Sequence, residues 1–436
     1  MTPYNFIGLL EAVLSRYFLP YLCLLHQFMI ALKIGLIREG KIPPDKRVAF
    51  TPLQAEEIEQ RFPEVNVVCQ TSQIRCFSDD EYVARDIKVA TEVSECDILM
   101  GIKEVPVDSL IPEKTYLFFS HTLKKQPYNR KLLQAALNKK VRLIDYEALK
   151  DKQGNRLVAF GRYAGIVGAY NGLWTYGQRY NKFNLRRAFD CFDVNDLKLE
   201  LEKARLPPIK ILLTGSGRVG KGAMETLDSA RIRKVNIHDF LYRKFDHPVY
   251  IQLSSGDYHT RKEGGHFNRE EFHKYPDRYS SHFSDFTKVT DILLAGAYWN
   301  PKAPVLFTKE DMLAADFRIR IIADITCDIN GSIPSTKRAS TIPDPIYDYD
   351  PHTDKLHSPF SNDSFISVMA VDNLPCELPR SASEEFGRDL IDRILQPLIE
   401  GDSDGIIERA TITLGGQLTS HFNYLHDYAF GADSNG

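Results

Sequence analysis

One segment constrains the fold of this chain more than any other, residues 209–227, which read IKILLTGSGRVGKGAMETL. An apolar strand runs into Gly215-x-Gly217-x-x-Gly220 and then into a helical pattern. In a dinucleotide-binding turn the first glycine allows the tight turn, the second lets the pyrophosphate approach, and the third lets the helix pack on the strand. The phosphates then meet the free N–H groups at the start of the helix. The segment therefore predicts a nucleotide-binding βαβ unit.

The choice of cofactor depends on the run that follows, KVNIHDF. It brings Asp239 to about the 20-residue distance at which such folds carry an acidic residue for the ribose 2′-OH. That residue favours NAD, because it repels a 2′-phosphate. His238, Arg243 and Lys244 lie close in sequence and could accommodate the phosphate. NAD is the expected cofactor, and NADP remains open.

Short apolar runs alternate with helical or turn-rich stretches along the whole chain. KIGLI, VNVVCQ, DILMGIK, TYLFFS and VRLIDYE predict strands before the glycine turn, and DILLAGAYW and FRIRIIADITCD predict strands after it. TPLQAEEIEQRF is expected to be a helix capped by Thr51, with Pro52 at its first position. RYAGIVGAYNGLWTYGQRY carries small residues at helical spacing, so a second helix is expected to approach it closely. This alternation predicts largely parallel sheets.

A chain of 436 residues is too long for one ordinary core. We therefore expect an α/β protein with two Rossmann-like doubly wound domains and a cleft between them. The dinucleotide-binding domain is placed at 166–373. The substrate and catalytic domain is placed at 29–165, with about 374–436 returning to it. Within the former, 245–290 are poor in aliphatic residues and are expected to form an inserted surface loop or hairpin.

Residues 1–28 are expected to be an N-terminal extension, because the alternating pattern begins only at Met29. The apolar stretch from Tyr17 to Leu32 is interrupted by Pro20 and by polar residues, and it is short for a membrane span. We expect no membrane association and a cytoplasmic location. The role of this extension is left open.

Composition excludes several classes of function. The formal net charge of −3 gives no indication of nucleic-acid binding. The seven cysteines are dispersed and include no C-x-x-C pair, which argues against a disulfide framework and a structural zinc site. No metal is expected.

Polar clusters follow several predicted strands, at the edge where open α/β sheets place ligands. A lysine and a histidine converging there would form an acid/base pair, because burial can lower a lysine pKa and histidine titrates near neutrality. Neighbouring carboxylates would favour the protonated forms. Arg47 and Arg156 are candidates for binding a substrate carboxylate. The clusters consist of Lys103, Glu104, His121, Lys124, Glu147, Asp324 and Asp328.

The sequence resembles the saccharopine dehydrogenases of the L-lysine-forming type, within the alanine dehydrogenase/transhydrogenase superfamily. The resemblance covers roughly residues 31–402. It is carried by the blocks KRVAFTP, GIKEVP, FSHTLKKQ, LIDYEAL, VAFGRYAGIVGA, TGSGRVGKGA, DITCD and VDNLPCELPRSASEEFG, in that order. HKYPDRYSSHF, AYWNP and GSIP are similar to the lysine-ketoglutarate reductase domain of bifunctional lysine-degrading enzymes.

The resemblance implies reversible conversion of saccharopine, NAD(P)⁺ and water into L-lysine, 2-oxoglutarate and reduced cofactor. In this family pattern Lys103 corresponds to the base and His121 to the acid. The expected substrate positions are Arg47, Gln126, Arg156, Phe160, Thr326, Cys327 and Asp328, to which the strand-end residues Glu104, Lys124 and Glu147 are added. The expected cofactor positions are Gly215, Ser216, Gly217, Arg218, Val219, Gly220, Asp239, Arg243, Tyr298, Ile325, Val371, Asp372, Asn373 and Leu374.

Two other functions remain as alternatives. One is an alanine dehydrogenase-like enzyme with a smaller substrate, against which Arg156 counts, because a substrate with several carboxylates needs more cations. The other is a catalytically idle protein that keeps the NAD fold, against which Lys103 and His121 count together. The sequence leaves the physiological direction and the oligomeric state open.

Overall fold

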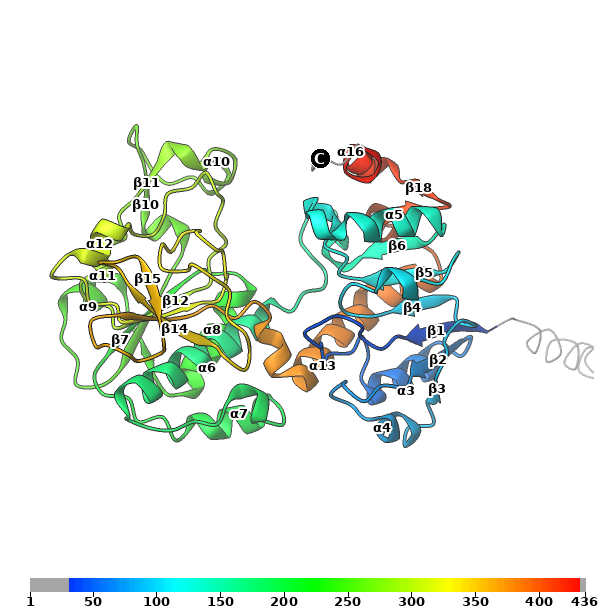
Figure 1. The fold of residues 1–436 in the computed structure, drawn as a ribbon, viewed down its shortest axis with the longest axis horizontal. Coiled ribbons are helices and arrows are strands. Elements are labelled where there is room, and N and C mark those ends of the chain that lie inside the picture. The colour runs from blue at the N-terminus through cyan, green and yellow to red at the C-terminus, as the bar shows by residue number, and fades with distance from the viewer. Residues whose placement is uncertain (1–30, 432–436) are drawn as a thin grey trace, which may run out of the picture. The chain divides into compact units, whose positions relative to one another are not determined.

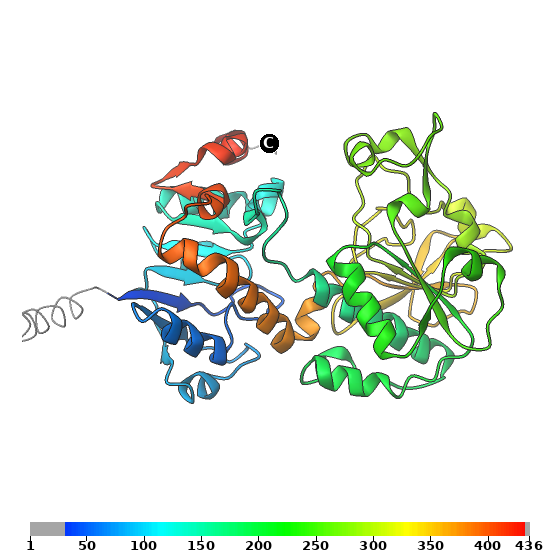
Figure 2. The ribbon, with the colours of Figure 1, turned by 180° about the vertical axis from the view of Figure 1, so that it is seen from behind.

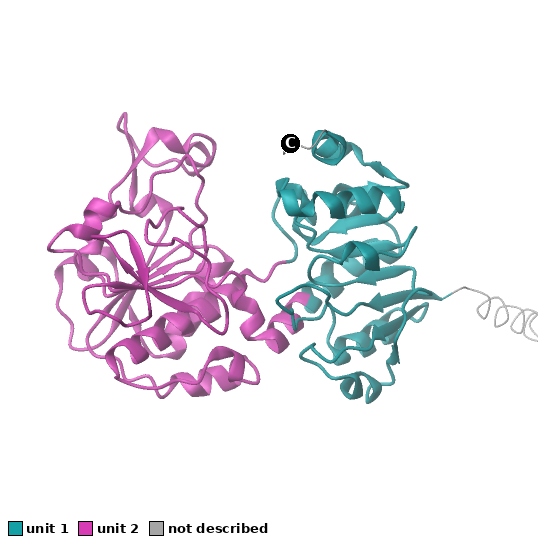
Figure 3. Cartoon of the chain, in the orientation of Figure 1, with its two compact units in different colours: residues 1–158, 387–436 teal, residues 159–386 magenta. Residues whose placement is uncertain are grey.

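The computed structural model describes residues 31–431, and Figures 1 and 2 show it from opposite sides. The chain divides into two compact units (Figure 3), unit 1 with residues 1–158 and 387–436 and unit 2 with residues 159–386. Each unit is built on a mostly parallel sheet with helices, so the predicted α/β class is confirmed. The predicted domain boundaries lie at 165/166 and 373/374. The roles of the units and the cleft between them stay predictions.

The proposed extension, residues 1–28, lies outside the described residues. No helix within residues 31–431 is long and apolar enough to cross a membrane. The expected cytoplasmic location stays a prediction.

Unit 1 contains an eight-stranded sheet in the order β18-β17-β6-β5-β4-β1-β2-β3. Its six strands from β1 to β6 are parallel, and β17 and β18 are antiparallel additions at one edge. The strand order reverses between β1 and β4, which is where open α/β sheets bind ligands. The strands are β1 (Leu32–Leu36), β2 (Val65–Gln70), β3 (Lys88–Ala90), β4 (Ile98–Met100), β5 (Thr115–Phe118), β6 (Arg142–Asp145), β17 (Thr411–Leu414) and β18 (Gln417–Leu418).

Helices cover both faces of this sheet. The helix α5 (Arg130–Asn138) lies against one face, and the segment from the end of α13 (Pro379–Leu390) through α14 (Gln396–Ile399) crosses the other (Figures 1 and 2). The predicted helix capped by Thr51 is confirmed as α3 (Pro52–Arg61), where Thr51 and Gln54 form a capping box. The remaining helices are α4 (Asp79–Val83), α15 (Ile406–Ala410) and α16 (His426–Phe430).

Unit 2 contains a second eight-stranded sheet, in the order β15-β14-β16-β13-β12-β7-β9-β8. Six neighbouring strands of this sheet, β8, β9, β7, β12, β13 and β16, run parallel to one another. β14 pairs antiparallel with β16, and β15 pairs antiparallel with β14. The strand order reverses between β7 and β12. These strands are β7 (Lys210–Thr214), β8 (Arg233–Lys234), β9 (Val249–Leu253), β12 (Ile292–Ala295), β13 (Ile321–Asp324), β14 (Ile346–Asp350), β15 (Lys355–His357) and β16 (Ile366–Met369).

The helix predicted from RYAGIVGAYNGLWTYGQRY is α6 (Gly161–Tyr180), which packs against β13 and against α8 (Arg218–Ser229). A Cβ on Gly165 would lie 1.9 Å from the Val219 carbonyl oxygen, and one on Gly222 would lie 1.9 Å from the Arg162 carbonyl oxygen. The backbones of the two helices therefore touch, and the predicted close approach of a second helix is confirmed. The other helices of the unit are α7 (Val194–Leu201), α9 (Ile237–Tyr242), α10 (Arg269–Lys274), α11 (Ser284–Thr287) and α12 (Lys309–Leu313).

The aliphatic-poor stretch 245–290 contains a hairpin, as predicted. Its strands are β10 (His259–Arg261) and β11 (Tyr279–Ser281), which pair apart from the main sheet. They lie with α10 at the top of unit 2 in Figure 1. An aromatic cluster of Phe267, Phe272 and Tyr279 forms the small core of this insertion.

Candidate functional site

The predicted acid/base pair lies on neighbouring parallel strands of unit 1. Lys103 and Glu104 follow β4, at the point where the strand order reverses, and His121 follows β5. The Glu104 Oε1 atom lies 2.6 Å from His121 Nδ1. This contact directs the other ring nitrogen, Nε2, away from the carboxylate. Lys41 approaches the same carboxylate, with 3.0 Å between its Nζ atom and Glu104 Oε2.

The surroundings of Lys103 favour its neutral form. Burial lowers the pKa of this amine, and the positive charges of Arg47 and Lys41 lower it further. Burial alone would raise the pKa of Glu104, but its hydrogen bonds to His121 and Lys41 outweigh burial and bring it to about 2. The centre therefore combines a lysine adjusted toward a base with a histidine held by a permanently ionised carboxylate.

The backbone of Lys103 is held by a residue that the sequence analysis missed, Glu39. Its carboxylate accepts hydrogen bonds from the N–H groups of Ile102, at 2.6 Å, and Lys103, at 2.9 Å. Burial and the nearby carboxylate of Asp45 raise the pKa of Glu39 to about 8. Its position just beyond β1, beside the strand-order reversal, was the available signal.

Arg47 is not an open carboxylate receptor in this structure. Its guanidinium binds Asp45 through two hydrogen bonds, Nε to Oδ1 at 3.0 Å and Nη2 to Oδ2 at 2.6 Å. Both side chains are almost fully buried, at 3% and 1% exposed. The geometry supports a role for Arg47 in the electrostatics around Lys103. Its predicted contact with substrate stays a prediction.

A second group of predicted substrate residues lines an open pocket of about 720 Å³ in unit 1. Arg156 pairs with Glu147, and Lys124 Nζ lies 3.5 Å from the same carboxylate. Lys124 ends the short helical turn that begins directly after His121, so the pocket adjoins the acid/base centre. Gln126 lies nearby in sequence and accepts a hydrogen bond from Tyr128.

The glycine turn of unit 2 has the geometry that pyrophosphate binding needs. Gly215 has a φ of +102°, and a Cβ there would meet the Gly296 backbone at 2.7 Å. A Cβ on Gly220 would lie 2.1 Å from the Gly215 carbonyl oxygen, whereas one on Gly217 would meet nothing within 4 Å. The helix α8 starts at Arg218 without a hydrogen bond from a capping side chain, and helix starts of this kind bind phosphates. These residues fit a dinucleotide.

Asp239 does not lie where the glycine motif calls for an acidic residue. It is in the helix α9, where its backbone N–H donates to the Asn236 side chain and its carboxylate faces Arg243 at 3.5 Å. The strand beside β7 is β9 instead, with Thr214 opposite Leu253. The apolar run KVNIHDF thus contributes only Lys234 to the edge strand β8, and from Ile237 onward it belongs to α9. The expected ribose contact of Asp239 is not supported by this topology.

The other predicted cofactor positions do follow strands of unit 2. Tyr298 follows β12, Ile325 follows β13, and residues 371–374 follow β16. Tyr298 is 78% exposed, and Asn373 donates a hydrogen bond to the sulfur of Cys376. Like the glycine turn, these positions lie at the carboxyl ends of parallel strands, as expected for a ligand site.

Four predicted substrate residues belong to unit 2 and not to unit 1. Phe160 stacks on Phe386, with 4.4 Å between ring centroids. The turn after β13 is held by the buried Asp324, whose Oδ1 atom accepts from the backbone and hydroxyl of Thr326 and from the Cys327 backbone. Burial raises the pKa of the Cys327 thiol to about 12. The fourth residue, Asp328, completes this turn.

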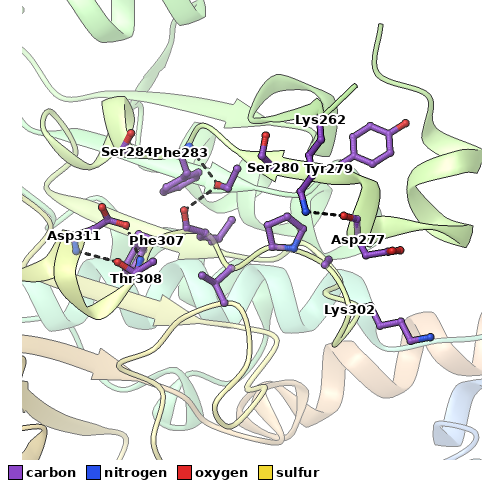
Figure 4. A pocket seen from close by; sticks show the side chains of 15 residues that line it. Lys262, Asp277, Tyr279, Ser280, Phe283, Ser284, Lys302, Phe307, Thr308 and Asp311 are labelled. Atoms are coloured by element: carbon purple, nitrogen blue, oxygen red, sulfur yellow. Dashed lines mark hydrogen bonds between the residues drawn. The ribbon is translucent and has the colours of Figure 1, made fainter. Parts of the chain in front are cut away.

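Figure 4 shows a further cavity, of about 530 Å³, that no predicted site residue lines. It lies in unit 2 between β11 and the loop before α12. Some of the side chains labelled there bond within the chain: Lys262 donates to the Asp277 carbonyl, and Thr308 pairs with Asp311. This internal pairing gives no indication of a ligand.

Residues 35–167 match the family model of the alanine dehydrogenase/PNT N-terminal domain. The chain is 31% identical over 409 residues to the mitochondrial alpha-aminoadipic semialdehyde synthase of Mus musculus, covering 82% of this chain and 44% of that protein. It is 27% identical to the L-lysine-forming, NAD(+) saccharopine dehydrogenase of Neurospora crassa, covering 80% of this chain and 87% of that enzyme. The chain therefore spans less than half the length of the mammalian relative. The resemblance read from the sequence is confirmed.

Solved structures show the same fold. An L-alanine dehydrogenase superposes with a TM-score of 0.58 at 13% identity, covering 91% of this chain and 99% of that one. A transhydrogenase from Sinorhizobium meliloti gives a TM-score of 0.56 at 13% identity, covering 89% and 98%. At this identity the likeness concerns the fold alone.

Proposed function

Residues 35–167 are a domain of the alanine dehydrogenase/PNT N-terminal family, and from this we propose that the protein interconverts saccharopine with L-lysine and 2-oxoglutarate, using NAD. The observation that carries the proposal is the placement of Lys103, whose pKa is lowered, next to the Glu104–His121 couple at the strand-order reversal of unit 1. The similarity to proteins named for saccharopine chemistry supports the choice of substrate.

Gly215, Gly217 and Gly220 would hold NAD, which in the direction of lysine formation would supply the acceptor for the hydride that leaves the glutamate-side carbon of saccharopine. Lys103, as the neutral amine, takes the proton of the secondary amine nitrogen, and an imine results. Water adds to the imine carbon. In the carbinolamine so formed, His121, held by Glu104, gives a proton to the nitrogen as the carbon–nitrogen bond breaks. The hydroxyl proton passes to water, so that the carbonyl of 2-oxoglutarate forms and lysine leaves.

Each neighbour has a separate task in this scheme. The positive charges of Arg47 and Lys41 keep Lys103 available as a base, since they disfavour its protonated form. Glu39 fixes the backbone of Lys103, and Glu104 orients the imidazole. Arg156 and Lys124, which both pair with Glu147, line the adjoining pocket, where they would contribute to the binding of a substrate carboxylate.

One assay separates this proposal from its alternatives. Purified protein should oxidise NADH when given L-lysine with 2-oxoglutarate, and should leave it unchanged when given pyruvate with ammonia. NADPH in parallel reports the choice of cofactor. Turnover with pyruvate and ammonia alone would point to an alanine dehydrogenase-like enzyme, and NADH binding without any turnover would point to an idle NAD-fold protein.

A further inference from the structure

The pocket of about 720 Å³ in unit 1 includes residues that neither the glycine motif nor the acid/base pair explains. We call it the C-terminal pocket, because its walls come partly from a segment near the end of the chain. Its lining residues include Lys124, Glu147, Lys150, Asp151, Arg156, Arg409, His421 and Tyr424. A pocket of this volume is in the usual range for small-molecule sites.

Strand pairing brings Arg409 to this pocket. The strand β17 runs antiparallel to β6, with Thr411 opposite Ile144, so the residues before β17 lie beside the residues that follow β6. The helix α15, which carries Arg409, begins on the Asp402 carboxylate, which accepts from the N–H groups of Ile406 and Glu408. Ile407, on the same helix, is fully buried. Arg409 therefore lies on a short helix that is fixed to the sheet of unit 1 by the buried Ile407 and by the pairing of β17 with β6.

The charges around the C-terminal pocket are not balanced. Its walls carry five basic residues, Lys124, Lys150, Lys152, Arg156 and Arg409, against the two carboxylates of Glu147 and Asp151. Several of these charges have partners: Arg156 and Lys124 lie on Glu147, and Lys152 lies on Asp404.

Arg409 differs from these paired cations. Its guanidinium donates to two backbone carbonyls, those of Asp404 at 2.7 Å and Lys150 at 3.4 Å. Among residues 31–431 it forms no ion pair with a carboxylate. Two neutral acceptors orient this group, and the Asp404 carboxylate interacts with its charge without forming an ion pair, so the guanidinium is still suited to bind an anion.

We infer that the C-terminal pocket binds the α-amino-acid head of lysine, with Arg409 as a carboxylate-binding residue and Glu147 facing the ammonium group. This inference rests on the proposed function. The two carboxylates of the glutamate half stay within a few bonds of the reacting carbon, at Lys103 and His121. The lysine head is separated from that carbon by its whole side chain, so it needs a cationic site next to the acid/base centre. Lys124, three residues after His121, lines the C-terminal pocket, so one short helical turn joins this pocket to the acid/base centre.

The test combines one substitution with one change of substrate. Arg409→Met should raise the KM for L-lysine roughly 10- to 100-fold, the usual effect of a lost charge-assisted hydrogen bond, with kcat and the KM for 2-oxoglutarate nearly unchanged. Cadaverine, which is lysine without its carboxylate, should be a poor substrate of the wild type. The KM for cadaverine should rise little in Arg409→Met, because cadaverine lacks the carboxylate that Arg409 binds. Arg409→Lys should restore part of the affinity for lysine.

The matched control is Arg85→Met, which removes a half-exposed arginine of unit 1 that pairs with Glu56. It should leave the KM for lysine unchanged. A similar KM for lysine in wild type and Arg409→Met, or a rise for 2-oxoglutarate instead, would overturn the inference while the proposed function stands. Thermal unfolding of both variants shows whether the substitution acts only through the stability of the fold. If kcat and the melting temperature of Arg409→Met fall together, the result also counts against the inference.

If the wild type does not turn over lysine with 2-oxoglutarate, the proposed function fails and calorimetry decides on the pocket. L-Lysine should then bind the wild type more tightly than it binds Arg409→Met, and cadaverine should not distinguish them. Absence of lysine binding to the wild type would overturn the pocket assignment as well.

Discussion

Glu104 Oε1 and His121 Nδ1 lie 2.6 Å apart, although they follow different strands of unit 1. The parallel pairing of β4 with β5 produces this contact, because it places the residues after both strands at one sheet edge. His121 has a φ of +54°, a left-handed conformation that is uncommon outside glycine. The backbone of the turn and the carboxylate thus fix the imidazole together, which a proton donor needs.

Replacing either member of the acid/base pair should abolish most turnover. We expect Lys103→Met and His121→Gln each to lower kcat by about 10²- to 10⁴-fold, the usual contribution of a general acid or base. NADH affinity should survive, because both residues lie in unit 1 and the glycine turn lies in unit 2. Steady-state rates and fluorescence titration with NADH, made on the same preparations, check both halves of this prediction. Near wild-type turnover in either variant would refute the assigned mechanism.

Glu104 should make stability depend on pH. Its pKa in the folded protein is about 2, below the ordinary value of 4.5, so its ionised form stabilises the fold. That contribution, about 3 kcal/mol at most, is complete above pH 4.5 and is lost as pH falls toward 2. Glu104→Gln should therefore be less stable than wild type near neutrality, with the difference shrinking in acid. Urea unfolding across this range measures it, and a difference independent of pH would contradict the assignment.

The contact between α6 and α8 leaves no room for a side chain at Gly165. A methyl group there would lie 1.9 Å from the Val219 carbonyl oxygen and 2.7 Å from the Ala223 nitrogen, and both of these atoms belong to the backbone of α8. Gly165→Ala should lower the free energy of unfolding by about 1–3 kcal/mol, the usual range for overpacking. Gly154→Ala is a control for added methyl volume, since nothing lies within 4 Å of that position, although its φ of +83° adds some strain. Equal stability of Gly165→Ala and wild type would argue against this packing.

Individual turns, helices and strands of this fold could be predicted well from the sequence, because local patterns determine them. The glycine turn at Gly215, the capped helix after Thr51 and the small-residue helix α6 all depend on residues close together in the chain. The sequence also predicted which polar residues follow strands. In parallel sheets such residues gather at one edge, so Lys103, Glu104 and His121 could be grouped before their distances were known.

Features that depend on strand order could not be read in this way. Arg409 reaches the C-terminal pocket only because β17 pairs with β6, and no local pattern announces that pairing. Glu39 was missed because its partners are backbone N–H groups of another strand's end. Asp239 has the expected spacing, but spacing cannot show that β9, and not the run containing Asp239, lies beside β7.

An acidic residue after β9, Asp257, is expected to distinguish NAD from NADP. In nucleotide-binding folds of this kind the ribose lies over the end of the strand next to the glycine turn. Here that strand is β9, and it ends in a turn where Asp257 accepts hydrogen bonds from the backbone N–H and the hydroxyl of Ser254, at 2.6 and 2.7 Å. Asp257 is exposed, so its carboxylate is accessible to a ribose hydroxyl. Asp239 lies in α9, one element away from this position.

Asp257→Asn should therefore raise the Kd for NADH roughly tenfold, because it removes a charged acceptor of the 2′-OH. It should also bring the Kd for NADPH closer to that for NADH, because it removes the repulsion of a 2′-phosphate. Asp239→Asn is the matched change at the residue chosen by spacing, and it should leave the ratio of the two affinities close to that of wild type. Fluorescence titrations with NADH and NADPH measure all four constants without any substrate. The opposite pattern, with Asp239→Asn altering the ratio and Asp257→Asn leaving it unchanged, would return the ribose contact to α9.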